Sequence, residues 1–467
     1  MISTRREFLT AVSALAAGMA ITSPLGAIMP HGKKLKIALV GTGIRGVTFW
    51  GERLISQYPD LLEFVGLCDI NPGRLKYAAE YMKVDCELFT DFEKMISKTG
   101  PDLVIVTTID STHQEFIIKA MKMGCDVMTE KPMAIDEDKT QAILDAETRY
   151  GKKVIVGFNY RWSPYFTKIK ELISQDAIGE LMSVDFSWML NNFHGAQYFR
   201  RWHGERDKSG TLLVHKSTHH FDLLNWWIDS EPYEVFGYGA LDHYGSNNSF
   251  RGKNCRDCNH TKECRYYWDI TRKERDMKLY VENEKYDGYI RDNCLFRHEI
   301  NIYDKMSVQA KYMNGVNLNY SLTTQSPYEG LKIALNGRNG RIEAWLDIPH
   351  LEENAVSQSE MHSMEMAQDI EEYDYRPIIV HRNWEDYEKL MIKVEKSGHG
   401  GGDKRLQDRL FTDSKADPDP LNHMAGSRDG AMSVLIGIAA RKSIETGKPI
   451  RIAELTSLEP RVKRLLG

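Results

Sequence analysis

The sequence predicts a doubly wound α/β domain over residues 34–157, followed by an α+β domain over residues 158–467 with a large, mostly antiparallel, open-faced sheet. In the first part, short continuous apolar runs alternate with helical segments, which is the pattern of a parallel sheet. After Gly157 the apolar residues alternate with polar ones and include many β-branched and aromatic side chains, which favours antiparallel strands. The change of pattern marks the domain boundary.

The elements of the first domain follow from its apolar runs. Strands are expected at residues 37–40, 64–69, 102–107, 126–130 and 154–157, and helices from about residue 44 and at 72–82, 91–99, 112–121 and 136–150. In a doubly wound sheet, ligands bind in the crevice outside the carboxyl ends of the strands. Side chains that directly follow these strands are therefore the first candidates for a functional site.

The second domain is expected to contain strands at residues 182–188, 234–239, 306–312 and 317–323, and helices at 165–174, 219–228, 384–396 and 429–446. Two stretches look inserted, a cysteine-bearing one at 243–294 and a polar one at 347–420. Aromatic residues are plentiful, and Trp and Tyr commonly stack on sugar rings, although packing in the core is the simpler explanation.

A glycine turn follows the first strand. Gly41 permits the tight bend, Gly43 lets the backbone approach a pyrophosphate, and Gly46 lets the next helix pack close to the strand. This spacing between a strand and a helix predicts a Rossmann dinucleotide-binding domain. The residues expected to contact the cofactor are Gly41, Gly43, Ile44, Arg45, Gly46, Asp69, Arg74, Thr107, His113, Glu130 and Lys131.

The second strand indicates which dinucleotide binds. Asp69 ends that strand, where a carboxylate accepts hydrogen bonds from a ribose 2′-hydroxyl and so favours NAD. Arg45 and Arg74 could instead bind a 2′-phosphate, so NADP is the less favoured alternative.

Residues 1–28 read as a twin-arginine (Tat) signal peptide. Arg5 and Arg6 precede Phe8 and Leu9, and an uncharged, alanine-rich stretch follows that is too short for a convincing membrane span. Such a signal exports a folded protein, so we expect a periplasmic protein that carries its cofactor out already bound. The net charge of −5 and the absence of a basic patch disfavour nucleic-acid binding.

Candidate catalytic residues follow the later strands. Lys131 comes directly after the strand at 126–130, where its ammonium would lie near a nicotinamide, and Tyr160 follows the strand at 154–157. His215, His219 and Asp222 are spaced four and three apart, which places them on one face of a helix. Oxidation of a hydroxyl needs a base for the O–H proton, and histidine or a lysine of depressed pKa suits this role. The candidate substrate residues are Arg161, Arg201, Trp202, His203, Lys216 and Asp222.

The turn at residues 41–46, Asp69, the Glu-Lys-Pro tripeptide at 130–132 and the segment from Gly210 to Asp222 together resemble the Gfo/Idh/MocA family. The resemblance extends over nearly the whole mature chain, including residues 328–343 and 431–443. It implies a Rossmann domain, an open-faced sheet that often mediates homo-oligomers, a catalytic lysine at Lys131 and a catalytic histidine at His219.

One residue departs from the family pattern. Inositol-dehydrogenase-like members carry an aspartate four residues before the catalytic histidine, whereas this chain carries His215. The substitution leaves room for a metal, for an acidic substrate such as a uronate, or for a second acid–base step.

Four of the seven cysteines lie in the first insertion. Cys255, Cys258, Cys264 and Cys294 have a spacing that suits a structural zinc site, and two disulfides are the alternative in an oxidising compartment. Cys68, Cys86 and Cys125 lie within or beside strands and are expected to be buried thiols.

These features predict a periplasmic oxidoreductase that acts on a ring hydroxyl of a sugar or glycoside with a tightly retained NAD. The alternative is an NAD-dependent glycoside hydrolase of the same fold, which would work by transient oxidation, elimination and re-reduction. A non-catalytic carbohydrate-binding relative is the third possibility, and the presence of both Lys131 and His219 argues against it.

Overall fold

The computed structural model describes residues 33–351, 373–396, 398–412 and 418–463. The Tat signal peptide expected at 1–28 lies outside them. No helix among these residues is long and apolar enough to cross a bilayer. The first domain forms a parallel sheet of order β3-β2-β1-β4-β5-β6, as its continuous apolar runs predict. The strands are β1 (Leu35–Val40), β2 (Leu62–Cys68), β3 (Glu87–Phe89), β4 (Leu103–Val106), β5 (Asp126–Thr129) and β6 (Val154–Val156).

Helices connect these strands, and three of them begin at a residue whose side chain caps the helix. Asn71, Asp91 and Asp136 each accept a hydrogen bond from a backbone N–H in the first turn of a helix, which stabilises the helix start. The helical segments are α2 (Ile44–Val47), the π-helix η1 (Thr48–Glu52), α3 (Arg53–Gln57), α4 (Pro72–Met82), α5 (Phe92–Thr99), η2 (Asp110–Thr112), α6 (His113–Lys122) and α7 (Glu137–Tyr150).

The second domain contains a sheet of order β14-β13-β12-β11-β7-β10-β9-β8-β15, in which only the β7–β10 pair is parallel. Its strands are β7 (Leu181–Asn191), β8 (Pro232–Ala240), β9 (Lys305–Tyr312), β10 (Asn317–Ser326), β11 (Gly330–Gly337), β12 (Gly340–Leu346), β13 (Tyr373–Arg382), β14 (Glu388–Glu395) and β15 (Ile450–Arg451). In β9 every second residue is buried, so one face of the sheet is covered and the other is open, as expected.

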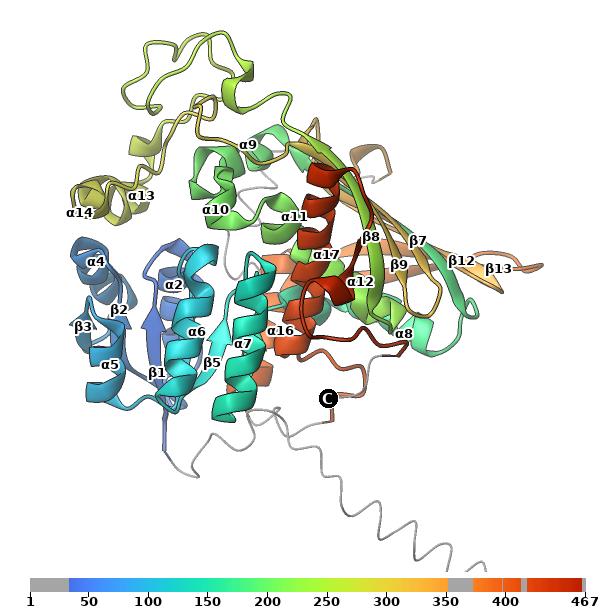
Figure 1. Cartoon of the computed structure of the whole chain (residues 1–467), viewed down its shortest axis with the longest axis horizontal. Coiled ribbons are helices and arrows are strands. Elements are labelled where there is room, and N and C mark those ends of the chain that lie inside the picture. The colour runs from blue at the N-terminus through green and yellow to red at the C-terminus, as the bar shows by residue number, and fades with distance from the viewer. Residues whose placement is uncertain (1–32, 352–372, 397, 413–417, 464–467) are drawn as a thin grey trace, which may run out of the picture.

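Helices cover the buried face of this sheet, and α12 and α17 pack against each other and toward β8 (Figure 1). The helical segments are η3 (Asn159–Trp162), α8 (Pro164–Ser174), α9 (Asn192–Arg200), η4 (Trp202–Gly204), α10 (Arg206–Ser209), α11 (Leu212–His215), α12 (Ser217–Ile228), η8 (Pro349–Leu351), η9 (Gly398–Gly401), α16 (Gly402–Phe411), α17 (Ser427–Thr446) and η11 (Ile452–Glu454).

The cysteine-bearing insertion leaves the second domain after β8 and reaches back to the first. Its helices α13 and α14 lie next to α4 in Figure 1. The segments are η5 (Gly245–Asn247), η6 (Ile270–Arg272), α13 (Glu274–Leu279), η7 (Val281–Asn283) and α14 (Glu284–Asp287). The insertion thus connects both domains across one side of the crevice.

The prediction of a helix at residues 384–396 is wrong. Residues 388–395 form β14, which pairs antiparallel with β13 and extends the large sheet. Leu390, Ile392 and Val394 recur at every second position and pack against the core of the second domain, which is the period of a strand. The polar stretch at 347–420 therefore contributes two strands of the sheet, and its last helix, α16, lies against the first domain.

Candidate active site

A large cavity of about 1360 Å³ lies between the domains, outside the carboxyl ends of the parallel strands. The glycine turn lines one part, and Lys131, His215 and His219 line another. The insertion contributes Tyr280 to the wall. The crevice position matches the rule for doubly wound sheets.

Geometry requires glycine at two of the three positions of the turn. Gly41 has a φ of +92°, and a Cβ there would lie 2.6 Å from the backbone carbon of Thr107. A Cβ on Gly46 would lie 2.2 Å from the carbonyl oxygen of Gly41. Gly43 instead faces open space, with the Tyr280 hydroxyl 3.8 Å from a built Cβ, so the backbone is accessible to a ligand.

Asp69 is held at the end of β2 by its neighbours. Its Oδ2 accepts a 2.8 Å hydrogen bond from the Thr42 N–H, and its Oδ1 lies 3.2 Å from Nη2 of Arg74. The same Arg74 guanidinium forms a second ion pair with Asp287 of the insertion. Arg74 is therefore neutralised by two carboxylates, which makes it a poor partner for a 2′-phosphate and favours a ribose 2′-hydroxyl.

Arg45 is also tied to carboxylates. Its Nε donates a 2.6 Å hydrogen bond to Glu130, and its Nη2 lies 3.7 Å from Asp403 of α16. Burial raises the pKa of Glu130, but Arg45 outweighs that effect and the net shift is downward. Glu130 also accepts a hydrogen bond from the Trp50 indole at 2.6 Å. Glu130 thus holds the Arg45 and Trp50 side chains directly next to Lys131 in the chain.

Thr107 and His113 support the crevice. Thr107 Oγ1 donates a 2.5 Å hydrogen bond to the Gly41 carbonyl. His113 is buried, and its ring nitrogens lie 2.8 Å from the Pro132 carbonyl and 3.1 Å from the Thr108 carbonyl. His113 therefore links the backbone just after Lys131 to the loop that follows β4.

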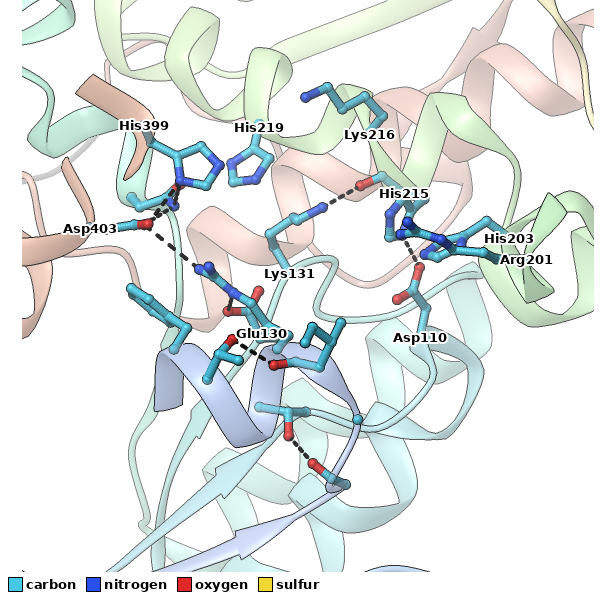
Figure 2. A pocket seen from close by; sticks show the side chains of 18 of the residues that line it. Asp110, Glu130, Lys131, Arg201, His203, His215, Lys216, His219, His399 and Asp403 are labelled. Atoms are coloured by element: carbon cyan, nitrogen blue, oxygen red, sulfur yellow. Dashed lines mark hydrogen bonds and ion pairs between the residues drawn. The ribbon is translucent and has the colours of Figure 1, made fainter. Parts of the chain in front are cut away.

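Lys131 projects toward the segment that carries His215 and His219 (Figure 2). Its Nζ donates a 3.0 Å hydrogen bond to the His215 carbonyl oxygen. Burial lowers the pKa of Lys131 to about 8, although Asp110 and Glu130 oppose the shift. The amine is thus prepared to exchange a proton near neutral pH.

His215 has a carboxylate partner that the sequence did not reveal. Its Nδ1 lies 2.6 Å from Oδ2 of Asp110, which follows β4 (Figure 2). Burial lowers the pKa of His215 and raises the pKa of Asp110. The aspartate missing four residues before His219 is therefore replaced in space by Asp110, which acts on His215 instead.

His219 sits against an aromatic wall. Its ring stacks on Tyr160 with centroids 4.4 Å apart, and its Nδ1 is buried without a hydrogen-bond partner. Burial, and then the charge of Lys131, lowers the pKa of His219. The ring is therefore neutral at neutral pH and can accept a proton. The Tyr160 hydroxyl accepts a 3.4 Å hydrogen bond from Lys216, whose Nζ also lies 4.6 Å from the Trp188 ring centroid.

Three further predicted substrate residues line the cavity. Trp202 stacks on His203 with centroids 3.7 Å apart, and His203 lies 4.3 Å from His215 by the same measure. Arg201 lies on the same wall, and burial, together with the charge of Arg291, lowers its pKa to about 10. Nitrogen-bearing side chains therefore dominate this wall.

Arg161 and Asp222 do not face the cavity, which corrects their prediction as substrate residues. Arg161 is fully buried and donates through Nε to Asp222 at 2.7 Å, and it also lies 3.3 Å from Asp429. His215 and His219 line the cavity, whereas Asp222, further along α12, pairs with Arg161 instead. The Arg161 guanidinium and the Asp222 carboxylate therefore neutralise each other and are not available to a substrate.

Other cavity residues were missed. His399 and Asp403 come from the polar stretch, with Nδ1 of His399 3.1 Å from Oδ2 of Asp403. His194 lines the cavity and lies 3.0 Å from Glu329, whose pKa burial raises to about 7. Asp110 carried the clearest sequence signal among the residues not predicted, since it lies in the loop that follows the parallel strand β4.

The expected zinc site is not found. All seven cysteines are free thiols, so the disulfide alternative is not found either. No group of Cys, His, Asp or Glu in the described ranges has a metal-binding arrangement. Cys255 is instead buried and accepts a 2.8 Å hydrogen bond from Arg200. Cys68 and Cys125 are buried, as expected, and Cys86 is partly buried.

A dinucleotide turn that faces a partly buried lysine and two buried histidines defines a dinucleotide-dependent oxidoreductase. Comparison with protein families leads to the same class. The model described as "Oxidoreductase family, NAD-binding Rossmann fold" matches residues 35–158, and that described as "Oxidoreductase family, C-terminal alpha/beta domain" matches residues 170–452. The chain belongs to the Gfo/Idh/MocA oxidoreductase family.

Individual relatives agree with this assignment. YteT of Bacillus subtilis, named only as an oxidoreductase, is 34% identical over 446 residues, which cover 91% of this chain and 99% of YteT. An inositol 2-dehydrogenase of Pseudomonas fluorescens is 28% identical over 202 residues, or 43% of this chain and 56% of that enzyme. The chain therefore aligns with little more than half of that dehydrogenase.

Solved structures share the fold. The WlbA dehydrogenase of Bordetella pertussis, in complex with NADH and UDP-GlcNAcA, has a TM-score of 0.60 at 18% identity and covers 90% of this chain and 99% of its own. A levoglucosan dehydrogenase in complex with NADH and levoglucosan has a TM-score of 0.61 at 16% identity, and the match covers 90% of this chain and 100% of that dehydrogenase. Both have the same two-domain architecture.

Proposed function

We propose that this protein is a periplasmic oxidoreductase that oxidises a ring hydroxyl of a sugar or glycoside with a tightly retained NAD. The observation that carries the proposal is Lys131, a partly buried lysine of lowered pKa that donates a hydrogen bond to the His215 carbonyl beside the dinucleotide site and points toward the segment carrying His219. The dehydrogenases among the relatives and solved structures act on inositol and levoglucosan by name, which supports a sugar or polyol substrate.

The residues divide the reaction between them. Bound NAD supplies the hydride acceptor for the C–H hydrogen of the carbinol carbon. Neutral Lys131 accepts the hydroxyl proton, and His219 is the alternative acceptor on the same side. Trp202 and Tyr160 offer ring faces for the sugar. Glu130 and His113 hold the Lys131 loop in place.

Three observations support the choice and retention of NAD. Arg74 is neutralised by Asp69 and Asp287, which disfavours a 2′-phosphate. Arg45, the other arginine considered for NADP, is committed to Glu130. The insertion lies across the cavity wall beside the glycine turn and would slow cofactor exchange.

A glycoside hydrolase is the second candidate, and the Asp110–His215 pair is the observation that favours it. Elimination after transient oxidation needs a base for an acidified C–H and an acid for the leaving oxygen. His215 with its carboxylate supplies a second acid–base group beside Lys131. This pair also accounts for the departure from the family pattern.

One incubation separates these functions. The purified protein is mixed with a panel of glycosides at comparable concentrations without an added acceptor, and products are followed by mass. Loss of two hydrogen atoms, with reduction of bound cofactor, supports oxidation. Release of a free sugar supports the hydrolase, and an unchanged ligand would contradict both.

Retention and location have their own tests. Denaturing the purified protein should release NAD into the supernatant, and an empty protein would contradict retention. Export rests on the Arg5–Arg6 motif. Replacing both arginines with lysine should keep the protein in the cytoplasmic fraction, and unchanged export would contradict the Tat assignment. We further propose that copies associate through the open face of the large sheet, which light scattering of the purified protein would test.

A further inference from the structure

The insertion carries a segment, residues 270–291, that we call the strap. The strap starts from a part of the insertion that is anchored to the second domain, where Arg200 donates hydrogen bonds to Cys255 Sγ at 2.8 Å and to the Tyr266 carbonyl at 2.6 Å. Its middle packs on the first domain, where Leu279 is fully buried. Asn71 Nδ2 donates a 2.9 Å hydrogen bond to the Asn283 carbonyl. The strap therefore crosses from one domain to the other.

The strap meets the glycine turn at Tyr280. The Ile44 N–H donates a 2.9 Å hydrogen bond to the Tyr280 hydroxyl. This amide follows Gly43, the position where a dinucleotide's pyrophosphate approaches the backbone. A hydroxyl within hydrogen-bond distance of that amide is also within reach of a phosphate bound there.

Arg291 lies directly behind Tyr280. The guanidinium carbon lies 4.5 Å from the centroid of the Tyr280 ring, and the residue is only 6% exposed. Its Nη1 donates a 3.4 Å hydrogen bond to the Tyr289 hydroxyl, while its Nε is buried without a partner. Among the ion pairs of the described residues, none involves Arg291 or Arg201.

Buried Arg291 and partly exposed Arg201 lie close together, and among the described residues no carboxylate is within ion-pair distance of either, although the charge of Asp276 acts on Arg291 from further away. A buried cation is normally paired, because burial removes the water that stabilises its charge. Here the charge of Arg291 helps to lower the pKa of its neighbour Arg201. Both side chains line the same cavity as the glycine turn. The arrangement therefore calls for an anion in the cavity.

We propose that Arg291 and Tyr280 bind the pyrophosphate of the cofactor from the side opposite the glycine turn, so that the strap slows cofactor release. The inference rests on the proposed retention of NAD and adds the residues responsible for it. The diphosphate is favoured over an acidic group of a substrate because Tyr280 links Arg291 to the amide of Ile44.

The test compares Arg291→Gln with Arg272→Gln in the full chain. Arg272 lies on the same strap, but its side chain is 81% exposed and its ion pair with Asp269 is on the surface. The apo protein is loaded with NADH, and its release into excess NAD is followed by fluorescence. We expect Arg291→Gln to release NADH about 10- to 100-fold faster, since it removes a charge-assisted hydrogen bond. Arg272→Gln should release NADH at the wild-type rate.

A ligand series locates the effect on the phosphates. ADP-ribose should lose affinity for Arg291→Gln by the same factor as NADH, whereas adenosine, which has no phosphate, should bind equally to both proteins. A second variant, Tyr280→Phe, keeps the ring beneath Arg291 and removes only the hydroxyl. It should release NADH a few-fold faster, and it carries the test if Arg291→Gln fails to fold.

Wild-type release rates and ADP-ribose affinities in the variants would overturn the inference. A variant that keeps its cofactor but shows a higher KM for an acidic sugar would assign Arg291 to the substrate and overturn it equally. The measurements use cofactor binding alone. If the wild-type protein releases NADH slowly but oxidises no sugar, the proposed function is contradicted and this inference still stands.

Discussion

The two halves of the cavity differ in how their charges are balanced. In the cofactor half, Arg74 is paired with Asp69 and Asp287, and Arg45 with Glu130. In the reacting half, burial lowers the pKa of Lys131 and of the neighbouring histidines. The first half is thus held by paired charges, whereas the second contains histidines that burial keeps neutral and a lysine whose pKa burial brings close to neutral pH. Binding and proton transfer are separated in space.

The largest expected effect is at the centre of the reacting half. Lys131→Met removes the proton acceptor but keeps most of the packing volume, so turnover should fall by about 10³-fold. Cofactor content should be unchanged, because the pairs that hold the cofactor half do not involve the ammonium. Absorbance of bound NAD and single-turnover rates measure the two quantities. Lys119→Met, on the surface of α6, is the control. A fully active Lys131→Met would remove the contrast between the halves.

Next in size is a purely structural change outside the cavity. Asp222→Ala leaves the fully buried Arg161 without its main carboxylate partner, and breaking a buried ion pair costs about 3–5 kcal/mol. The midpoint of thermal unfolding should fall, while KM of the remaining folded enzyme should stay near the wild-type value. A raised KM with unchanged stability would return Asp222 to the substrate site.

The pH dependence sharpens the contrast further. Lys131 accepts a proton only in its neutral form, and burial lowers its pKa to about 8. For oxidation, kcat/KM should therefore rise about tenfold per pH unit below this value and level off above it. The reverse reduction should show the opposite trend, because it needs the protonated amine. A profile that stays flat from about pH 6 to about pH 9, a range on both sides of this pKa, would contradict the role of Lys131.

The smallest effect is expected at the far end of the cofactor half. Asp287→Asn removes one of the two carboxylates on Arg74 and frees part of its charge for a 2′-phosphate. The ratio of Kd values for NADPH and NADH should shift toward NADPH by a few-fold, since Asp69 still opposes it. Fluorescence titration measures both constants. An unchanged ratio would show that Asp287 has no part in cofactor choice.

The sequence predicted what short motifs determine. The glycine turn, Asp69 and Lys131 each depend on a few neighbouring residues, and the structure places all three on the cavity. The parallel sheet followed by a mostly antiparallel one was also predicted, because the change in apolar period reports directly on burial.

What the sequence could not supply were contacts between distant residues. Asp110 and His215 are 105 residues apart, and nothing local shows that they meet. The buried pairing of Arg161 with Asp222 was hidden for the same reason, so both were misassigned to the substrate. The strand at 388–395 was predicted as a helix although its apolar residues recur at every second position. It is an edge strand in which no residue is fully buried, so its apolar signal is weak.

Helix α16 ties the end of the chain to its beginning. Gln407 donates a hydrogen bond to the Phe49 carbonyl at 2.9 Å, and the Tyr58 hydroxyl donates one to Asp408 at 2.7 Å. Asp403 of the same helix lies beside Arg45. The nucleotide pocket is therefore completed only after more than four-fifths of the polypeptide has been synthesised, so that a truncated or half-folded product lacks a finished pocket. Occupancy by the dinucleotide would consequently distinguish a fully assembled molecule from an incomplete one.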